Sequence, residues 1–452
     1  MEQGETVRNN RMATEPVNKL LLTMSLPLMI SMATEALYNV VDTLFVSRIG
    51  EHAITALSLA FPVQLLVVSI TVGTGVGVGA LLSRLLGERN KRGVDSTAAN
   101  GIFLAAVTYA LFLIFGLFFT KRYYAAQTQD AVIYKYGVDY LSICMIWSFG
   151  AVGQIIFQRL LQSTGRTALS MISQLTGAAA NIVLDPVLIF GLCGAPKLGV
   201  AGAAIATVIG QIAALFIAIF LNLKFNRDIS FDPRGFRSNL WTIKKIYAIG
   251  APAIVMQSLN SLMVFGVNLI LTRLSSTAVA AFGIYIKVQN FVFMPAFGLN
   301  NAVIAVAAFS YGASNRERLR GTIKFGMLYA AAIMLAGTAA VEIFAEPILS
   351  LFDASPELLT VGARAMRIIS ASYIFTAFMI VAQGAYQALG NGVYSLIVTM
   401  LRVVVILLPL LWVFSVLFPP DSVWWAFVIS EILSAAASAL LLKKICVEKG
   451  CA

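Results

Sequence analysis

Three polar side chains share one face of an otherwise apolar segment of the chain. Glu35, Tyr38 and Asp42 are spaced i, i+3 and i+7 in a helical register, and Asn39 lies beside them. An ionised carboxylate costs about 3 kcal/mol at the centre of a membrane helix, so an acid in such a segment needs a functional reason. The pattern predicts that Asp42 binds a cation or a proton.

A second acid occurs in the stretch NIVLDP. Asn181 and Asp185 are spaced i, i+4 and share a helical face, and Pro186 removes a backbone donor and leaves a carbonyl oxygen free. Thr207 adds a hydroxyl on the next apolar segment. At about 1.5 Å per residue, we expect Asp42 and Asp185 to lie about 9 Å, and Thr207 about 12 Å, inside the end of the span that faces the outside of the cell.

Three helices would therefore present oxygen atoms at one level. Hard cations prefer oxygen ligands, and two neighbouring carboxylates favour protonation of one of them. These residues predict a coupling site for Na⁺ or H⁺ and do not distinguish the two ions; its members are Asp42, Asn181, Asp185 and Thr207. The alternative is that the polar groups only hold the helices together by hydrogen bonds.

The composition indicates the elements that position these residues. The 452 residues are 59% hydrophobic and 12% charged, with a mean hydropathy of +0.86, which is too apolar for a soluble protein of this length. Apolar segments long enough to cross a bilayer recur about twelve times. We expect spans near 19–48, 53–82, 96–120, 133–158, 168–191, 199–223, 244–274, 279–309, 321–344, 360–386, 393–418 and 423–442.

The basic residues orient these spans in the membrane. Most of the 32 lysines and arginines lie in the tails and in alternate loops, at 8–19, 84–92, 159–166, 224–245, 316–324 and 443–449. The positive-inside rule then predicts a multi-pass protein of the cell membrane with both termini in the cytoplasm. The net charge of +11 needs no nucleic-acid partner, because it faces an anionic lipid leaflet. We expect a monomer.

The chain contains an internal repeat. Placed so that Pro27 meets Pro252, the two halves align without a gap over a long stretch, and Asn90 then meets Asn315. An even number of spans per half makes the repeat parallel. The expected domains are a cytoplasmic tail (1–18), an N-lobe of six spans (19–223), a cytoplasmic linker (224–243), a C-lobe of six spans (244–442) and a second cytoplasmic tail (443–452).

The two acids are not repeated. Asp42 aligns with Val267 and Asp185 with Leu410. A carboxylate that only stabilised the fold would more plausibly be duplicated with its helix. The asymmetry indicates a function confined to the first half, although divergence alone could also remove the acids.

At these residues the chain resembles the multidrug and toxic compound extrusion (MATE) family, and most closely its prokaryotic DNA-damage-inducible branch. The matching stretches are SLPLMI, YNVVDTLFVSRIG, GTGVGVGALLSRLLGERN, LLQSTGR, NIVLDPVLIFG and GVAGAAIAT. The resemblance implies an all-α integral membrane protein with twelve transmembrane helices in two pseudo-symmetric six-helix lobes around a central cavity. It also implies efflux of amphipathic, often cationic compounds in exchange for Na⁺ or H⁺.

The resemblance assigns roles to individual residues. It implies that Asp42, Asn181, Asp185 and Thr207 form the cation site, which would hold a metal ion if the coupling ion is Na⁺, and that Pro27 allows the first helix to bend. Some relatives bind their cation in the second lobe through acids on the seventh and tenth helices. The corresponding spans here carry Gln257, Asn260 and Gln383 but no acid, so we do not expect a site there.

Further polar residues in the spans are candidates for the substrate cavity: Glu35, Tyr38, Asn39, Gln158, Gln257, Lys287 and Gln289. Glu35 lies outside the family motif and its role is open, whereas Lys287 is expected to line the cavity. Arg402 and Glu431 lie in the last two spans and either pair with each other or act separately. The glycines of GTGVGVG lack the Lys-Ser/Thr of a phosphate loop, so close helix packing explains them better.

The sequence argues against several other functions. It contains no Walker motif, no nucleophile–base pair and no close cysteine pair, so we expect no cofactor, no catalytic residues and no enzymatic activity. The hypothesis is an ion-coupled antiporter. Its rivals are a flippase or exporter of a lipid-linked or other amphipathic metabolite, and a receptor that does not transport.

Overall fold

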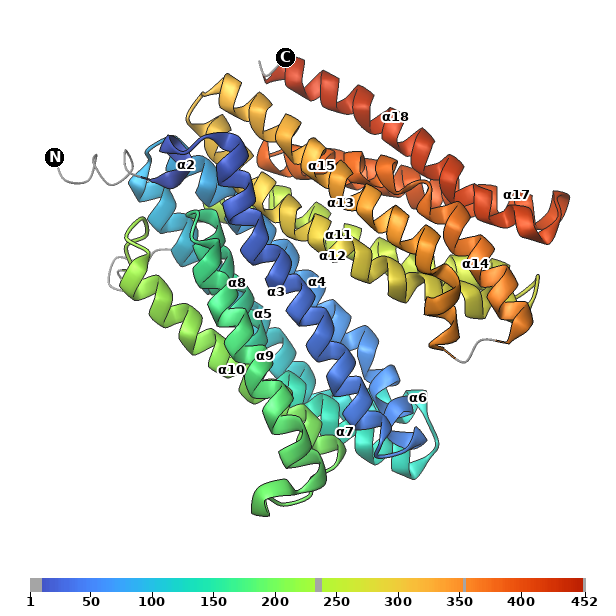
Figure 1. The fold of residues 1–452 in the computed structure, drawn as a ribbon. Coiled ribbons are helices and arrows are strands. Elements are labelled where there is room, and N and C mark those ends of the chain that lie inside the picture. Colours follow the sequence, from blue (N-terminus) through green and yellow to red (C-terminus); the bar gives the residue numbers. More distant parts are fainter. Residues whose placement is uncertain (1–9, 232–237, 353–354, 450–452) are drawn as a thin grey trace. The chain divides into compact units, whose positions relative to one another are not determined.

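The computed structural model describes residues 10–231, 238–352 and 355–449, which form helices joined by short turns (Figure 1). The helices of the first half are α2 (Arg11–Thr14), α3 (Val17–Ser47), α4 (Glu51–Gly87), α5 (Lys91–Phe118), α6 (Thr120–Gln127), α7 (Ala131–Ile146), α8 (Phe149–Ser163), α9 (Thr167–Phe190), η1 (Leu192–Gly194) and α10 (Val200–Phe225). The helices of the second half are α11 (Leu240–Leu271), α12 (Ser276–Gly312), α13 (Arg316–Ser350), α14 (Pro356–Ser370), α15 (Tyr373–Ala388), α16 (Gly392–Met400), η3 (Leu401–Leu407), α17 (Leu408–Leu417), η4 (Pro420–Trp424) and α18 (Trp425–Glu448).

The helices account for the twelve expected spans. Ten helical segments in the described ranges are long and apolar enough to cross a membrane, and two bent pairs bring the number to twelve if each pair is one span. The pairs are α7–α8, bent by 43°, and α14–α15, bent by 49°. The predicted all-α, twelve-span fold class is confirmed. The spans are longer than expected, because α18 continues to Glu448 and α3 begins at Val17, both inside the predicted tails.

The internal repeat is visible in the backbone. Asn90 and Asn315 each cap the next helix, with side-chain oxygens that accept hydrogen bonds from the amides of Gly93 and Arg318. The residues before these caps have the same left-handed conformation, with φ of 55° at Arg89 and 54° at Ser314. The repeat also includes the two bends, which the sequence did not predict.

The chain divides into two compact units. The first unit contains residues 10–14 and Ile30–Gly250, and the second contains Glu15–Met29 and the described residues from Ala251 onward. The units differ from the expected lobes at two helices: the first part of α3 belongs to the second unit, and the first part of α11 belongs to the first unit. Helix α3 changes unit two residues after Pro27, and α11 changes unit just before Pro252. The predicted linker 224–243 and the outermost parts of both tails lie partly outside the described residues.

Helix packing in the first unit depends on small residues. Helix α10 packs on α8 and α9, which lie beside it in Figure 1, and α4 packs on α5, α7 and α8. A Cβ atom at Gly77, in GTGVGVG, would lie 2.2 Å from the carbonyl oxygen of Ile246 on α11. The glycines therefore let helix backbones approach closely, as expected from their sequence.

Candidate functional site

Helix α9 carries the centre of the candidate site. Asn181 and Asp185 are 3% and 0% exposed, and the Asn181 amide nitrogen lies 3.3 Å from the Oδ1 atom of Asp185, one turn further along the helix. The same nitrogen lies 3.3 Å from the Oγ1 atom of Thr207 on α10. Three of the four predicted cation-site residues are therefore in direct contact.

Close packing of α9 against α10 makes these contacts possible. A Cβ atom at Gly177 would lie 2.8 Å from the carbonyl oxygen of Gly210, and a Cβ atom at Gly210 would lie 2.7 Å from that of Gly177. The two backbones therefore approach without side chains between them. This approach lets the short side chains of Asn181 and Thr207 reach each other.

Asp42 on helix α3 interacts with this group electrostatically. Its carboxylate is near enough to that of Asp185 to interact with it electrostatically. It also interacts electrostatically with Tyr140 and Cys144 of helix α7. The two acids thus belong to one electrostatic cluster, contributed by helices far apart in the sequence.

Oxygen atoms in this cluster lack hydrogen-bond partners. Asp42 Oδ1, Asn181 Oδ1 and Asp185 Oδ2 are buried and accept no hydrogen bond from any residue that the structure describes. Buried polar atoms without partners are costly, and native proteins usually satisfy them with protein groups, water or ions. Carboxylate and amide oxygens are ligands that Na⁺ accepts as a hard cation, and a carboxylate also accepts a proton. The donor set therefore fits either ion.

Residues that the sequence did not single out surround Asp42. The Gln64 amide nitrogen on α4 lies 3.2 Å from the Tyr140 hydroxyl and 3.9 Å from the Cys144 sulfur. Gln64 was detectable as a polar residue in an apolar span, and the repeat pairs it with Gln289. Tyr140 and Cys144 gave no such signal, because a tyrosine and a cysteine are ordinary residues in a membrane helix.

Glu35 lies on the same helix as Asp42 but has a different partner. It interacts electrostatically with Arg159 of α8. A Cβ atom at Gly75 would lie 2.9 Å from the Cγ atom of Arg159, so this glycine makes room for the arginine side chain. Arg159 was expected in a cytoplasmic loop. It lies within α8 instead, because that helix continues to Ser163.

The other candidates for the substrate cavity fall in different surroundings. In the first unit, Tyr38 is half-buried, Asn39 is exposed, and Gln158 is buried, with its amide nitrogen 3.1 Å from Gln174 Oε1. In the second unit, Gln257 is half-buried on α11. Lys287 is exposed, with its Nζ atom 5.6 Å from the centre of the Phe352 ring.

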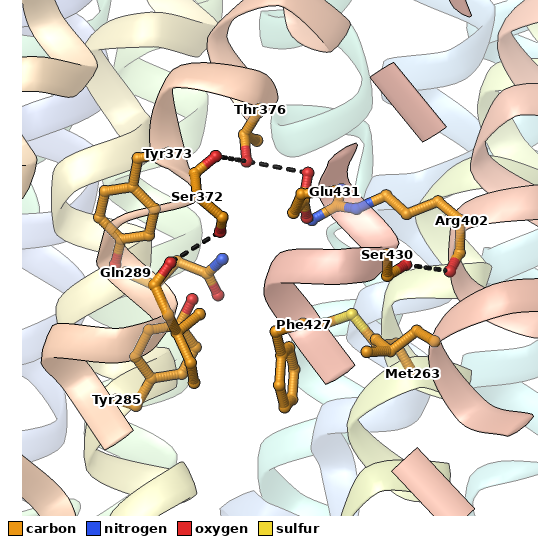
Figure 2. A pocket seen from close by; sticks show the side chains of 12 residues that line it. Met263, Tyr285, Gln289, Ser372, Tyr373, Thr376, Arg402, Phe427, Ser430 and Glu431 are labelled. Atoms are coloured by element: carbon orange, nitrogen blue, oxygen red, sulfur yellow. Dashed lines mark hydrogen bonds and ion pairs between the residues drawn. The ribbon is translucent and has the colours of Figure 1, made fainter. Parts of the chain in front are cut away.

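Gln289 lines a pocket within the second unit (Figure 2). The pocket also contains Arg402 and Glu431, which form an ion pair, so the structure selects the first of the two alternatives that the sequence left open. Within the described residues, no group of three or more histidine, cysteine or acidic side chains could hold a metal ion. The candidate cation site relies instead on two acids with amide and hydroxyl oxygens.

A family model described as MatE matches residues 27–187 and again 252–413. The chain belongs to the MatE family. The two matches begin at Pro27 and Pro252, which are the residues that the internal repeat pairs. Family membership identifies this MatE protein as a membrane transporter and not an enzyme.

Curated relatives and solved structures agree with this assignment. The MatE chain is 28% identical over 437 residues to the FAD transporter of Shewanella oneidensis, covering 95% of each chain. It is also 28% identical over 419 residues to the multidrug export protein MepA of Staphylococcus haemolyticus, covering 92% of this chain and 91% of that one. The solved outward-facing structure of a multidrug resistance MATE family transporter superposes with a TM-score of 0.92 at 25% identity, covering 98% of both chains.

Proposed function

We propose that this protein is a secondary active multidrug exporter, which expels amphipathic, often cationic compounds in exchange for Na⁺ or H⁺. The observation that carries the proposal is the set of buried oxygens without partners at Asp42, Asn181 and Asp185. A small cation or a proton would satisfy these atoms and neutralise the acids. No cofactor is needed besides the coupling ion.

Coupling requires that the ion and the substrate prefer different conformations. They need not touch each other, because each ligand shifts the equilibrium only by its difference in affinity for the two states. Helix α3 is suited to transmit the change, since it carries Asp42 in the first unit and changes unit two residues after Pro27. Proline removes a backbone hydrogen bond and allows a helix to bend.

The energy available from the coupling ion is sufficient for export. One elementary charge that crosses 100 mV releases about 2.3 kcal/mol, enough for roughly a 50-fold gradient of substrate. A neutral antiport would draw instead on the concentration gradient of the ion. Both cases require that the acids of the site release the ion on the other side of the membrane.

The relatives named as multidrug export proteins support small amphipathic molecules as the substrates. Glu35 supports positively charged ones, because it is a second acid on the α3 face that carries Tyr38 and Asp42. A substrate cation could compete with Arg159 for this carboxylate. The basic loops support a cell-membrane protein with both termini in the cytoplasm, and we propose that it works as a monomer.

An exporter of an amphipathic metabolite is the second candidate. The relative named as an FAD transporter favours it. Within the first unit, Arg159 in α8 would suit a substrate that carries phosphate groups. Both candidates use the same ion site, so they differ only in the substrate.

Reconstitution into lipid vesicles tests both candidates. The purified protein is loaded into vesicles, and the movement of ethidium and of FAD is followed while Na⁺ and pH gradients are imposed separately. We expect ethidium to move against its gradient with at least one of the two ions; movement of FAD alone would favour the second candidate. An Asp42→Asn variant that inserts normally should lose the ion dependence, and full ion-driven transport by this variant would contradict the proposal.

A further inference from the structure

An ion pair joins two helical segments of the second unit. The side chains of Arg402 on η3 and Glu431 on α18 are 19% and 8% exposed, and they form a salt bridge. The Glu431 Oε2 atom also accepts a hydrogen bond from the Thr376 hydroxyl at 3.0 Å. Both oxygens of this carboxylate therefore have partners, whereas Asp42 and Asp185 in the first unit each have one buried oxygen that accepts no hydrogen bond from the described residues.

The repeat relates this pair to the candidate cation site. Helices α9 and α16 begin at Thr167 and Gly392, and helices α10 and α18 begin at Val200 and Trp425. Both pairs of starting residues keep the spacing that separates Pro27 from Pro252. The register of the repeat therefore holds through the last two spans.

The ion-site residues of α9 and α10 correspond to apolar residues in the second unit. The repeat matches Asn181, Asp185 and Thr207 with Ile406, Leu410 and Ile432, respectively. Glu431 directly precedes Ile432, and Arg402 lies one turn before Ile406. The second unit thus has its own acid and its own cation next to the positions where the first unit has its oxygen cluster.

The backbone around Arg402 is adapted to its position. Residues Leu401–Leu407 form a π-helix, whereas the corresponding part of α9 is an ordinary α-helix. π-Helical turns are rare and occur frequently at functional sites. The Ser430 hydroxyl donates to the carbonyl oxygen of Arg402 at 2.9 Å, which ties η3 to α18 directly beside the ion pair.

The remaining neighbours of the pair are uncharged. Figure 2 shows Arg402 and Glu431 meeting on one side of the pocket, with Tyr285 and Tyr373 on the other. These two tyrosines are the titratable groups of α12 and α15 that interact electrostatically with Glu431. Tyrosine is neutral below about pH 10. The described cluster therefore contains one positive and one negative charge and needs no further ion.

We propose that Arg402 is a built-in cation of the second unit, which neutralises Glu431 permanently and makes this unit insensitive to the coupling ion. The guanidinium is covalently attached to the chain, so it cannot leave the site as a mobile ion does. Glu431 therefore cannot bind and release a mobile cation during a transport cycle. Ion coupling is then restricted to the first unit. The role of Arg402 is positional: it holds η3, α15 and α18 together through Glu431. The comparison between units rests on the proposed function, whereas the neutralisation of Glu431 does not.

Removal of the arginine should create an ion-dependent site. The test uses the full chain with Asp42→Asn and Asp185→Asn, so that the first unit cannot respond, and measures the thermal unfolding midpoint against Na⁺ concentration and pH. Without Arg402→Met this parent should show no Na⁺ dependence. When Arg402→Met is added to this parent, the unfolding midpoint should fall at neutral pH. It should recover by several degrees when Na⁺ is added or the pH is lowered, because the unpaired buried carboxylate of Glu431 is tolerated once it is neutralised.

Two further variants of the same parent separate this role from ordinary packing. Arg402→Lys keeps a cation and should remain independent of Na⁺, whereas Arg402→Met combined with Glu431→Gln should fold without any ion dependence. A folded Arg402→Met variant whose midpoint ignores both Na⁺ and pH overturns the proposal. This readout does not require transport, so it is separate from failure of the proposed antiport.

A second measurement covers the case in which Arg402→Met does not fold. Glu431→Gln is introduced into the otherwise unaltered chain, and its unfolding midpoint is followed against the same ions. We expect the Na⁺ or pH response of the unaltered chain to persist, since no mobile ion binds at Glu431. Loss of that response would show that Glu431 itself binds the coupling ion, and it would overturn the proposal.

Discussion

Asn181 holds one oxygen of Asp185 and leaves the other without a partner: its amide nitrogen lies 3.3 Å from Oδ1, and Oδ2 accepts no hydrogen bond from the described residues. The amide therefore orients the carboxylate without neutralising it. Asn181 also contributes an oxygen of its own, which is likewise buried and without a partner. Asn181 and Asp185 therefore hold a carboxylate in a fixed orientation, and each has a buried oxygen that a cation could contact.

The first prediction concerns this pair. Asn181→Ala removes one oxygen and the group that orients Asp185, so the apparent affinity for the coupling ion should fall by about 10-fold or more, as for other residues that orient ion ligands. The measurement is the ion concentration that gives half-maximal transport in vesicles. Thr176→Val on the same helix is the control, because that hydroxyl only bonds the Ile172 carbonyl of its own helix. Equal effects of the two variants would contradict the assignment.

The second prediction concerns Glu35 and Arg159. Glu35 and Arg159 are half-buried charges of opposite sign that attract each other, so removing one leaves the other less compensated, whereas removing both is often close to neutral. We expect Glu35→Gln and Arg159→Met each to lower the unfolding midpoint, and the double variant to be more stable than the less stable single one. Thermal unfolding of the unaltered chain, the two single variants and the double variant gives the interaction energy between Glu35 and Arg159. Strict additivity of the two single effects would mean that the residues do not interact.

The third prediction concerns the packing of GTGVGVG. Gly77→Ala puts a Cβ atom 2.2 Å from a backbone oxygen of Ile246, so the helices must separate. We expect a loss of stability of about 3 kcal/mol, the upper end for overpacking. Gly283→Ala on α12 is the matched control, because its Cβ atom meets nothing within 4 Å. It should stabilise its helix by about 0.5–1 kcal/mol, and the two substitutions must differ in sign in the unfolding assay.

The fourth prediction concerns a pH effect outside the membrane. Hydrogen bonds from the backbone amides of Ile133 and Val132, with a smaller contribution from His52, lower the pKa of Asp130 from its usual 3.8. Because the folded-state pKa is the lower one, the stabilisation is fully present above the usual pKa and is lost as the pH falls through the folded value. Asp130→Asn should therefore lose less stability than the unaltered chain between neutral and strongly acidic pH. Identical acid sensitivity of the two proteins would exclude this cap as a contributor.

Much of the fold followed from local patterns. Apolar length predicted the twelve spans, and the constant spacing between matching residues such as Pro27 and Pro252 predicted two similar halves, because both depend on residue order alone. The ends of the spans were less accurate: α8 continues to Ser163 and α18 to Glu448. A helix continues past its apolar segment for as long as its backbone hydrogen bonds are satisfied, so hydropathy alone does not mark its end.

The candidate site was predictable only in part. Helical spacing placed Asn181 beside Asp185, since residues four apart on a helix are always neighbours. The proximity of Thr207 depended on Gly177 and Gly210, which let α9 and α10 approach closely. Residue order gave no sign of the electrostatic interaction between Asp42 on α3 and Tyr140 on α7.

The sequence by itself determined the membrane class of this protein, its repeat, and the helical face of each acid, because these depend on residue order alone. Only the tertiary structure decided which helices are neighbours, and thus which polar atoms find partners. It gave Glu431 an arginine and a threonine, and it left Asp42 Oδ1 and Asp185 Oδ2 without a partner among the described residues. The physical reason is that hydrogen bonds and ion pairs act over a few ångströms, and distance along the chain does not set those distances in space.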